Sequence, residues 1–483
     1  MSERYSMLIG GRWVLGSTSF PVHNPSDVRD VVGDAPCATQ QDVHDALEAA
    51  RTALPAWRDA SVLARGAVLE AAARLIEKSE QQLSFLISRE IGKLRGEALA
   101  EVRKTRDFFA YYAGLARAPW GQLLADGRSW TTVAVRREAL GVVALVTPWN
   151  DPVLTAARKL CPALLCGNTA ILKPAPQAAL CALSLARILE EAGIPAGVLN
   201  VLTGQGDDVG KWTVSAEGLD GISFTGSTEV GLEISALGGR TNLPVQTEMG
   251  GKNTAVVLAD ADLDLAVRCV SDGAYTQAGQ RCTATSRVLV TEDRYDEFVS
   301  KLQNRVVSLR TGLAEAPDSE MGPLIEGNHR DVIASAVKNA VLAGASLVCE
   351  GAAIDDSVYA HGNFMVPALI ADVPLGDEVW TSELFGPVLA VRRTKDLEEA
   401  IEAVNGGPYG LSSALFSRDI DAVERFSSAA NVGCVAVNLP TAGWDVHVPF
   451  GGFKLSGGGS KEQGLAALDF YSRLKTVAVR TRE

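Results

Sequence analysis

The chain has 483 residues, of which 47% are hydrophobic and 21% are charged, a composition that excludes a disordered or fibrous protein. Its net charge of −13, without a basic segment interleaved with aromatic residues, argues against a nucleic-acid partner. No apolar run has the length of a signal-peptide core or a membrane span, so we expect a cytoplasmic protein without a membrane partner. A chain of this length exceeds a single hydrophobic core, and we expect two large domains.

The first half of the chain changes from a helical pattern to an alternation of strands and helices. Apolar residues recur at intervals of three and four from residue 41 to residue 116, which predicts helices. After Pro119 the segment TTVAVRREALGVVALVTPWN is rich in β-branched residues and predicts extended strands, the last of them buried. TAILKP, GVLNVLTGQG and LDGISFTGS each have the pattern of a strand that runs into a turn before a helix. This alternation predicts a parallel, doubly wound sheet.

A second alternation begins near NTAVVLADADLDLAV and continues to GCVAVNLP, with no linker rich in Gly, Ser or Pro between the two sets. The expected fold class is therefore α/β, with two closely packed, doubly wound Rossmann-like domains. The glycine-rich segment PFGGFKLSGGG at 449–459 contains two phenylalanines and predicts an ordered loop near a site rather than a flexible linker. The closing stretch LDFYSRLKTVAVRT ends in a strand pattern without a neighbouring partner, so this strand should join another element or another subunit.

The eight cysteines lack a disulfide-framework spacing and are expected to be free thiols, and Cys282 in AGQRCTATS is a candidate nucleophile. A Cys–His hydrolase is disfavoured because none of the five histidines lies in a cysteine-protease signature. A metal site is also disfavoured, since Cys161 and Cys166 are five residues apart in a helical context and do not share a face. We expect both to be packing residues, and no metal.

Two turns have features of phosphate-binding sites, and two polar residues have positions suited to catalysis. TGQGDDVG, which contains Gly206, is one residue longer than the dinucleotide fingerprint, and an ordinary strand-to-helix turn explains it equally well. FTGSTEVG puts Gly226 and Ser227 where a helix begins, and free backbone N–H groups there suit a pyrophosphate. Glu248 in QTEMGGKN suits a general base at a strand end, with a salt-bridged glutamate as the alternative. Asn150 in VTPWND is a candidate functional residue, and the alternative is that it only forms a turn after the proline.

Taken in order, seven motifs make the chain resemble the aldehyde dehydrogenase superfamily over essentially its full length. They are TPWN at 147–150, NTAILKPA at 168–175, SFTGSTEVG at 223–231, EMGGKN at 248–253, GQRC at 279–282, ELFGPV at 383–388 and PFGGFKLSG at 449–457. The resemblance implies a cofactor-binding domain at 1–118 and 141–248, a catalytic domain at 249–460, and a small β oligomerisation element at 119–140 and 461–483. It also implies NAD or NADP as the cofactor and a homodimer or homotetramer.

By the same resemblance, Cys282 is the nucleophile, Asn150 donates to the oxyanion and Glu248 is the base for deacylation. The thiolate adds to the aldehyde, the Asn150 amide and the Cys282 N–H hold the alkoxide, and hydride passes to the nicotinamide. Glu248 then deprotonates the water that hydrolyses the thioester, and no metal takes part. Because a thiol with a pKa of about 8.5 is mostly protonated at neutral pH, we expect Arg281 and the bound nicotinamide to favour the thiolate.

The resemblance also assigns the cofactor contacts and suggests which cofactor is used. The ten contact positions are Thr147, Trp149, Lys173, Pro176, Gly206, Phe224, Gly226, Ser227, Glu383 and Phe385. Family members that prefer NAD usually carry glutamate three residues after the lysine, whereas KPAP puts Pro176 there. Proline neither accepts bonds from the ribose hydroxyls nor repels a 2′-phosphate, so we expect NADP to be accepted.

The positions that match the family's substrate tunnel are unusually polar. They are Lys104, Asp151, Leu154, Arg158, Asp272, Thr276, Arg281, Thr283 and Trp444. A long alkyl aldehyde would leave such charges desolvated and unpaired, so a polar or charged substrate is expected, with Arg158, Arg281 and Trp444 as its contacts. Several motifs are most similar in sequence to the 2-oxoglutarate semialdehyde dehydrogenase branch of the family. In semialdehyde dehydrogenases of the superfamily, the arginine that matches Arg158 binds the distal carboxylate of the substrate. The segment KLSGGGSKEQG differs from the sequence usual in the 2-oxoglutarate branch.

Several alternatives remain open at this point. Arg158 could instead pair with Asp151, seven residues earlier on the same helix face. A polar aromatic aldehyde stacked on Trp444 is the second candidate substrate. A coenzyme A-acylating aldehyde dehydrogenase shares the thiol chemistry, although Glu248 favours water as the acyl acceptor. A non-catalytic scaffold is disfavoured because Cys282, Asn150 and Glu248 are all present.

Overall fold

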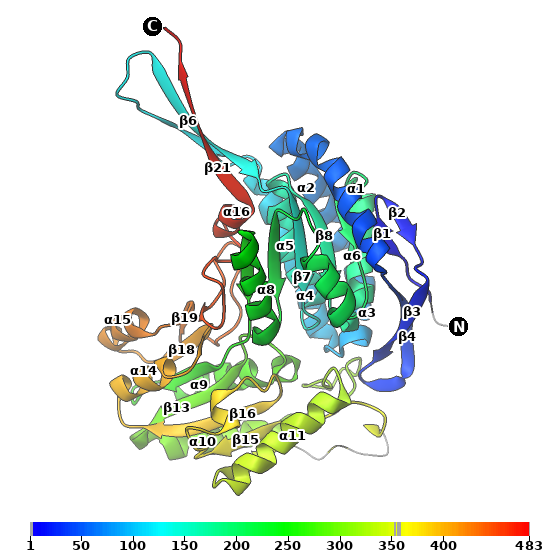
Figure 1. Cartoon of the computed structure of the whole chain (residues 1–483). Helices are drawn as coiled ribbons and strands as arrows, with labels where there is room; N and C mark the ends of the chain where they lie inside the picture. The colour runs from blue at the N-terminus through cyan, green and yellow to red at the C-terminus, as the bar shows by residue number, and fades with distance from the viewer. Residues whose placement is uncertain (1–2, 352–353, 355–358, 483) are drawn as a thin grey trace.

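A computed structural model describes residues 3–351, 354 and 359–482 and contains two seven-stranded sheets and a projecting β arm (Figure 1). Both sheets are predominantly parallel and carry helices on their faces, as the alternating pattern predicts. The predicted α/β class with two doubly wound sheets is therefore confirmed. In the described part of the chain, no helix combines the length and apolarity that crossing a bilayer requires.

The first sheet has the strand order β11-β10-β7-β8-β9-β1-β2, in which β11 to β9 are parallel and β1 and β2 join antiparallel at one edge. Its strands are β1 (Met7–Ile9), β2 (Arg12–Val14), β7 (Val142–Thr147), β8 (Thr169–Pro174), β9 (Leu199–Val201), β10 (Gly221–Thr225) and β11 (Val245–Glu248). The parallel strands are buried almost throughout, as expected for a sheet covered on both faces.

The helical segment of the N-terminal half forms four helices, and further helices connect the strands of the first sheet. The four are α1 (Gln40–Asp59), α2 (Val62–Lys78), α3 (Glu80–Ile91) and α4 (Arg95–Leu115). The connecting helices are α5 (Pro152–Leu165), α6 (Ala179–Glu191), α7 (Lys211–Val214) and α8 (Thr228–Thr241), with short turns η1 (Pro176–Ala178) and η2 (Gly206–Gly210). Thr39 forms a capping box with Asp42 at the start of α1, and Gly92 ends α3 at a φ of 80°.

The second sheet has the order β14-β15-β16-β13-β12-β18-β19 and is parallel except for β14 at its edge. Its strands are β12 (Asn253–Val257), β13 (Thr285–Thr291), β14 (Ser346–Glu350), β15 (Ala368–Ala371), β16 (Val388–Thr394), β18 (Ser412–Phe416) and β19 (Cys434–Val437). Its helices are α9 (Leu263–Tyr275), η3 (Thr276–Gly279), α10 (Glu292–Ser308), α11 (Gly327–Leu342), α13 (Glu378–Thr381), α14 (Leu397–Asn405) and α15 (Ile420–Ala429). One large apolar cluster fills the space between this sheet and its helices.

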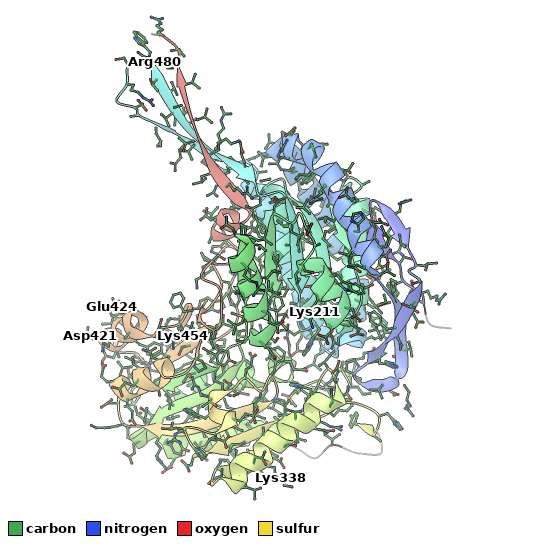
Figure 2. The ribbon with its side chains drawn as sticks, viewed as in Figure 1. Lys211, Lys338, Asp421, Glu424, Lys454 and Arg480 are labelled. Carbon is green, nitrogen blue, oxygen red and sulfur yellow. The ribbon has the colours of Figure 1, made fainter. Side chains whose placement is uncertain are left out.

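The C-terminal strand β21 (Ser472–Arg480), which follows α16 (Ala466–Phe470), finds its partner within the same chain. It pairs antiparallel with β6 (Thr131–Ala139), which also pairs with β5 (Gly121–Leu124), and the three strands project from the body as an arm. Figure 2 labels Arg480 near the tip of this arm. The strands β3 (Thr18–Asn24) and β4 (Asp27–Cys37) form a separate hairpin. The sequence pattern did not indicate either this hairpin or β1 and β2.

The glycine-rich segment at 449–459 is ordered, as expected. Its strand β20 (Phe453–Lys454) pairs with β17 (Tyr409–Gly410), and Met249 N donates to Ser456 O at 3.0 Å. These contacts hold the segment against the end of β11, where Glu248 lies. The first sheet falls within residues 7–248, the second within 253–437, and the arm within 121–139 and 472–480.

Candidate active site

A cavity of about 240 Å³ lies where the carboxyl ends of β7, β10 and β11 face loops of the second sheet. In doubly wound folds this edge of the sheet is where ligands bind. The cavity brings together nine of the predicted site residues: Cys282, Glu248, Asn150, Trp149, Arg158, Gly226, Ser227, Glu383 and Phe385. These residues come from distant parts of the chain, so their convergence is not a consequence of local sequence.

Cys282 follows a tightly constrained turn. Gln277 and Ala278, in η3, have φ values of 55° and 53°, a left-handed conformation that costs free energy for residues other than glycine. The buried carboxylate of Glu97 accepts a hydrogen bond from Gln277 N at 2.8 Å. Gly279, at a φ of 69°, lies so close to Gly386 that an added Cβ would be 2.3 Å from the Gly386 carbonyl oxygen. The surroundings thus fix the backbone that carries the thiol.

Amide side chains hold the same loop on its other side. Asn150, buried between β7 and α5, donates from Nδ2 to the Gln280 carbonyl oxygen at 3.1 Å. Asn253 Nδ2 donates to the Cys282 carbonyl oxygen at 2.8 Å. Gln280 in turn accepts from Ile325 N at 2.9 Å. Asn253, Gln280 and Glu97 were not predicted as site residues because their partners are far away in the sequence. Asn253 belongs to the EMGGKN motif and Gln280 to the GQRC motif, and this membership is the one signal that could have singled them out.

Burial sets the protonation of the two groups expected to do chemistry. It raises the pKa of Cys282 well above the ordinary thiol value, the Glu248 charge raises it further, and Arg158 opposes both. Burial also raises the pKa of Glu248 to about 8, with Glu462 as the second cause. Neither carboxylate oxygen of Glu248 has a hydrogen-bond partner among the described residues. Burial thus favours the neutral form of both groups, and Arg158 is the leading cation that favours the thiolate.

Arg158 belongs to a buried charge cluster that sequence reasoning missed. Its Nη1 lies 3.6 Å from Glu462 Oε2, and Lys159 Nζ lies 2.5 Å from Glu462 Oε1. The guanidinium also stacks over the Phe450 ring at 4.8 Å. Asp151, the alternative partner considered for Arg158, is instead bound by Lys93 at 2.5 Å. Glu462 lies 304 residues after Arg158 in a segment without a local signature, which is why the pair could not be foreseen.

The predicted nicotinamide-side residues line the same cavity. Glu383 Oε1 accepts from Gly251 N at 3.0 Å, and burial raises the Glu383 pKa to about 7. A Cβ at Gly250 would lie 2.3 Å from Glu383 Oε2, so only glycine admits the carboxylate there. Phe385, at a φ of 53°, meets Trp149 edge-to-face with ring centroids 5.5 Å apart.

The remaining predicted cofactor residues lie along the carboxyl ends of β7, β8 and β10 or just beyond them. Ser227 caps α8 through Val230 N, and a Cβ at Gly226 would lie 2.6 Å from the Phe224 ring. Lys173 Nζ is buried and donates to the Pro174 carbonyl oxygen at 2.7 Å, and burial lowers its pKa to about 8. Thr147 Oγ1 is buried and has no partner among the described residues.

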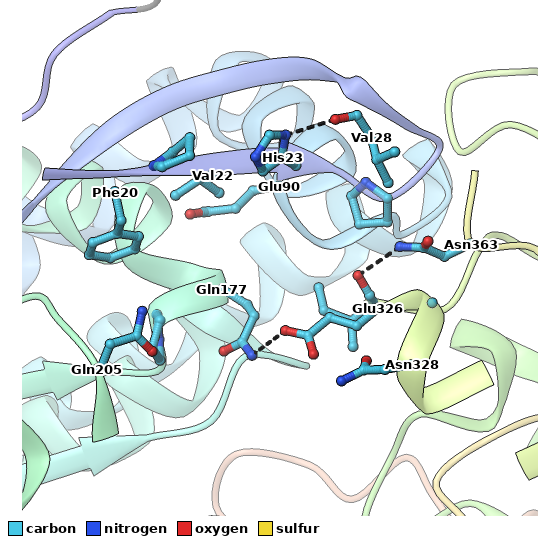
Figure 3. Close-up of a pocket in the computed structure, with 15 residues that line it drawn as sticks. Phe20, Val22, His23, Val28, Glu90, Gln177, Gln205, Glu326, Asn328 and Asn363 are labelled. Carbon is cyan, nitrogen blue, oxygen red and sulfur yellow. Dashed lines mark hydrogen bonds between the residues drawn. The ribbon is translucent and has the colours of Figure 1, made fainter. Parts of the chain in front are cut away.

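A second cavity of about 610 Å³ lies between the β3–β4 hairpin and the turn that begins at Pro176 (Figure 3). Gln177 Nε2 donates across the cavity to Glu326 Oε1 at 2.7 Å. This hydrogen bond links the part of the chain that contains the first sheet to the part that contains the second. Pro176 and Gln205 line this cavity, and Gly206 starts η2 directly after Gln205.

The predicted substrate residues Arg281 and Trp444 lie outside the cavity lining but next to it. Arg281 is half-buried beside Cys282 in the chain, and Trp444 packs with Cys282 against Leu411, Cys434 and Phe450. Lys104, on α4, donates from Nζ to the Trp444 carbonyl oxygen. Among the described residues, no group of His, Cys, Asp and Glu side chains has the arrangement of a metal site.

Comparison with known proteins agrees with this geometry. The profile of the Aldehyde dehydrogenase family matches residues 13–477. An alpha-ketoglutaric semialdehyde dehydrogenase of Bacillus subtilis (strain 168) is 36% identical over 478 residues, which cover 99% of this chain and 98% of the relative. An alpha-ketoglutarate semialdehyde dehydrogenase of Haloferax volcanii is 38% identical over 480 residues, covering 99% of each chain.

Solved structures give the same result. A crystal structure of betaine aldehyde dehydrogenase from Staphylococcus aureus in complex with NAD+ superimposes with a TM-score of 0.96 at 31% identity and covers 100% of this chain and 95% of the other. The chain therefore belongs to the aldehyde dehydrogenase family, which confirms the resemblance carried by its seven motifs.

Proposed function

We propose that the chain oxidises an aldehyde to a carboxylic acid through a covalent intermediate on Cys282, with NAD or NADP as the oxidant. The observation that carries the proposal is the convergence of Cys282, Glu248 and Asn150 in one cavity that Glu383 and Phe385 also line. A nucleophile, a base and an amide donor are the groups that such a reaction requires.

The residues present suit a dinucleotide. Lys173 and the unpartnered Thr147 hydroxyl offer polar groups for the adenosine ribose and the phosphates, and the N-terminus of α8 at Ser227 suits a pyrophosphate. Pro176, which lines the cavity of Figure 3, and Gly206, which follows its lining residue Gln205, are proposed contacts on the adenosine side. Gly226 is proposed to face the pyrophosphate with Ser227, and Phe224 to line the cofactor cleft. Glu383 is proposed to bind the nicotinamide ribose, and Phe385 with Trp149 to position the ring. When bound, the nicotinamide supplies the hydride acceptor.

Cys282, as the thiolate, adds to the aldehyde carbonyl, and Asn150 with the Cys282 N–H stabilises the alkoxide that forms. An amide NH₂ has two N–H bonds, so Asn150 can keep its bond to Gln280 and donate the other to the oxyanion. After oxidation to the thioester, Glu248 takes a proton from water, the hydroxide attacks the acyl carbon, and the thiolate leaves as the carboxylic acid forms. No described residue hydrogen-bonds to the Glu248 carboxyl group, so the group is free for this role once it has ionised, near pH 8.

The proposed substrate is a polar, carboxylated semialdehyde such as 2-oxoglutarate semialdehyde, with Arg158, Arg281 and Trp444 as contacts. The two relatives from Bacillus subtilis and Haloferax volcanii, both alpha-ketoglutarate semialdehyde dehydrogenases, support this class. So do the positive charges of Arg158 and Arg281 near Cys282, since a carboxylate compensates such charges and an alkyl chain does not. A polar aromatic aldehyde stacked on Trp444 and transfer of the acyl group to coenzyme A are the alternatives.

We also propose a homodimer or homotetramer in which the arm contributes to the contact. The arm carries exposed apolar side chains, including Leu123, Trp130 and Leu474, and exposed apolar clusters commonly mark interaction surfaces. The proposed domain division is the one expected from the resemblance, with the arm as the oligomerisation element. Light scattering tests the assembly, and a monomer at micromolar concentration would contradict it.

A panel of aldehydes with NAD and with NADP, followed by the absorbance of the reduced cofactor, tests the function. Carboxylated semialdehydes should give the highest kcat/KM, and uncharged alkyl aldehydes of equal length lower values. The same assay with coenzyme A identifies the product: a free acid supports Glu248-assisted hydrolysis, and an acyl-coenzyme A contradicts it.

A further inference from the structure

Lys104 is a half-buried cation that forms no ion pair with any described residue. It projects from α4, and within the described part of the chain its only hydrogen bond goes to the carbonyl oxygen of Trp444. Burial lowers the pKa of Lys104, and Arg158 and Arg281 lower it further, so three cations lie close enough together to repel one another. A buried cluster of like charges destabilises the folded protein unless a bound anion neutralises it.

The neighbours of Lys104 are also donors without acceptors. The Arg281 guanidinium makes no hydrogen bond or ion pair within the described residues. The Trp444 indole Nε1 is buried and has no acceptor there, and the same holds for Arg158 Nε. Buried donors are normally satisfied, so the missing acceptors point to a ligand rich in oxygen atoms.

The carboxylates near this cluster already have partners. Lys93 lies 2.5 Å from both Asp151 and Glu101, and Lys159 and Arg158 share Glu462. Asp445, the other acid that acts on Lys104, is mostly exposed and lies 3.4 Å from His447. Among the described residues Lys104 and Arg281 therefore form no ion pair, and Asp151, Asp445 and Glu97 act on them only without direct contact. Arg158, by contrast, lies against Glu462.

The position of the cluster suits the far end of a substrate. Arg281 precedes Cys282 directly, and Trp444 packs on the same apolar residues as Cys282, while Lys104 contacts the backbone of Trp444. We propose that Lys104, Arg281 and the indole N–H of Trp444 form an anion subsite that binds the distal carboxylate of the aldehyde. This inference rests on the proposed function and adds Lys104 as a specificity-determining residue to the proposed contacts Arg158, Arg281 and Trp444.

Titration calorimetry with glutarate, a five-carbon dicarboxylate, tests the subsite without requiring turnover. Loss of a charge-assisted hydrogen bond should raise the glutarate Kd of a Lys104→Gln variant about tenfold to a hundredfold. Lys104→Arg keeps the charge and should bind within about threefold of the wild type. Lys338→Gln, on the exposed surface of α11 (Figure 2), is the matched control and should bind like the wild type.

The pH dependence separates the charge of Lys104 from a merely structural role. Because the Lys104 pKa is lowered, the wild type should lose glutarate affinity as the pH rises toward 10, and Lys104→Arg should not. The other charged groups that face Lys104 are Asp151, Asp445, Arg158 and Arg281. Equal Kd values for the wild type and Lys104→Gln, or no glutarate binding by the wild type, would overturn the inference. The proposed function fails separately if the wild-type enzyme reduces neither NAD nor NADP with any aldehyde of the panel.

Discussion

Arg158 Nη1 lies 3.6 Å from Glu462 Oε2 in the buried cluster next to Glu248. Glu462 raises the pKa of Glu248, whereas Arg158 lowers it. In an Arg158→Gln variant the pKa of Glu248 should therefore rise above its wild-type value of about 8. The rising, acid-side limb of the kcat profile, which reports ionisation of Glu248, should move to higher pH. Arg103→Gln, at an exposed position on α4, is the control, and an unshifted limb in Arg158→Gln would show that the two charges are not coupled.

Glu248 should make deacylation faster as the pH rises. With a pKa of about 8, the carboxylate form that can accept a proton grows between pH 7 and pH 9, so the turnover rate should rise through this range and then level off. A Glu248→Gln variant should form about one equivalent of reduced cofactor in a burst and then turn over at least about 10²-fold more slowly. Stopped-flow absorbance measures both phases. Steady turnover at the wild-type rate would remove Glu248 from the mechanism.

Asn150 should act on the transition state rather than on binding. Loss of one donor to an oxyanion typically lowers kcat by about 10²- to 10³-fold, so Asn150→Ala should lose activity in this range while KM changes little. Because Asn150 also donates to the Gln280 carbonyl oxygen, a thermal unfolding curve is needed beside the kinetics. A raised KM with unchanged kcat would assign Asn150 to substrate binding instead.

Pro176 should leave the enzyme open to NADP. Neither its ring nor Gln177 beside it carries a negative charge that would repel a 2′-phosphate. The ratio of kcat/KM values for NAD and NADP should lie far below a thousandfold, and Pro176→Glu should shift it toward NAD by restoring an acceptor for the ribose hydroxyls. A thousandfold preference for NAD in the wild type, about 4 kcal/mol, would contradict the prediction.

The sequence predicted those parts of the fold and the site that have a local signature. The buried strands β7, β8 and β10, the turn at Gly226 and Ser227, and the strand end at Glu248 follow from patterns of a few residues. The short strands β1 and β2 were missed because each has three residues, too few for a period to show.

Long-range partners set the rest of the site. The Lys159–Glu462 ion pair joins residues 303 apart, and Glu97 reaches Gln277 across 180 residues. Pairing between such distant residues depends on how the helices and loops pack, and a short sequence pattern does not contain that information. Likewise, the strand β21 has an alternating pattern, but only the folded chain reveals β6 as its partner.

The central claim is that the Cys282 sulfur forms the covalent intermediate. The kcat of a Cys282→Ser variant, with the aldehyde that the wild type oxidises best, tests it directly, since a serine hydroxyl in this buried place is a far weaker nucleophile than a thiolate. We predict a loss of at least about 10³-fold with cofactor binding retained. Oxidation by Cys282→Ser at the wild-type rate would contradict the account.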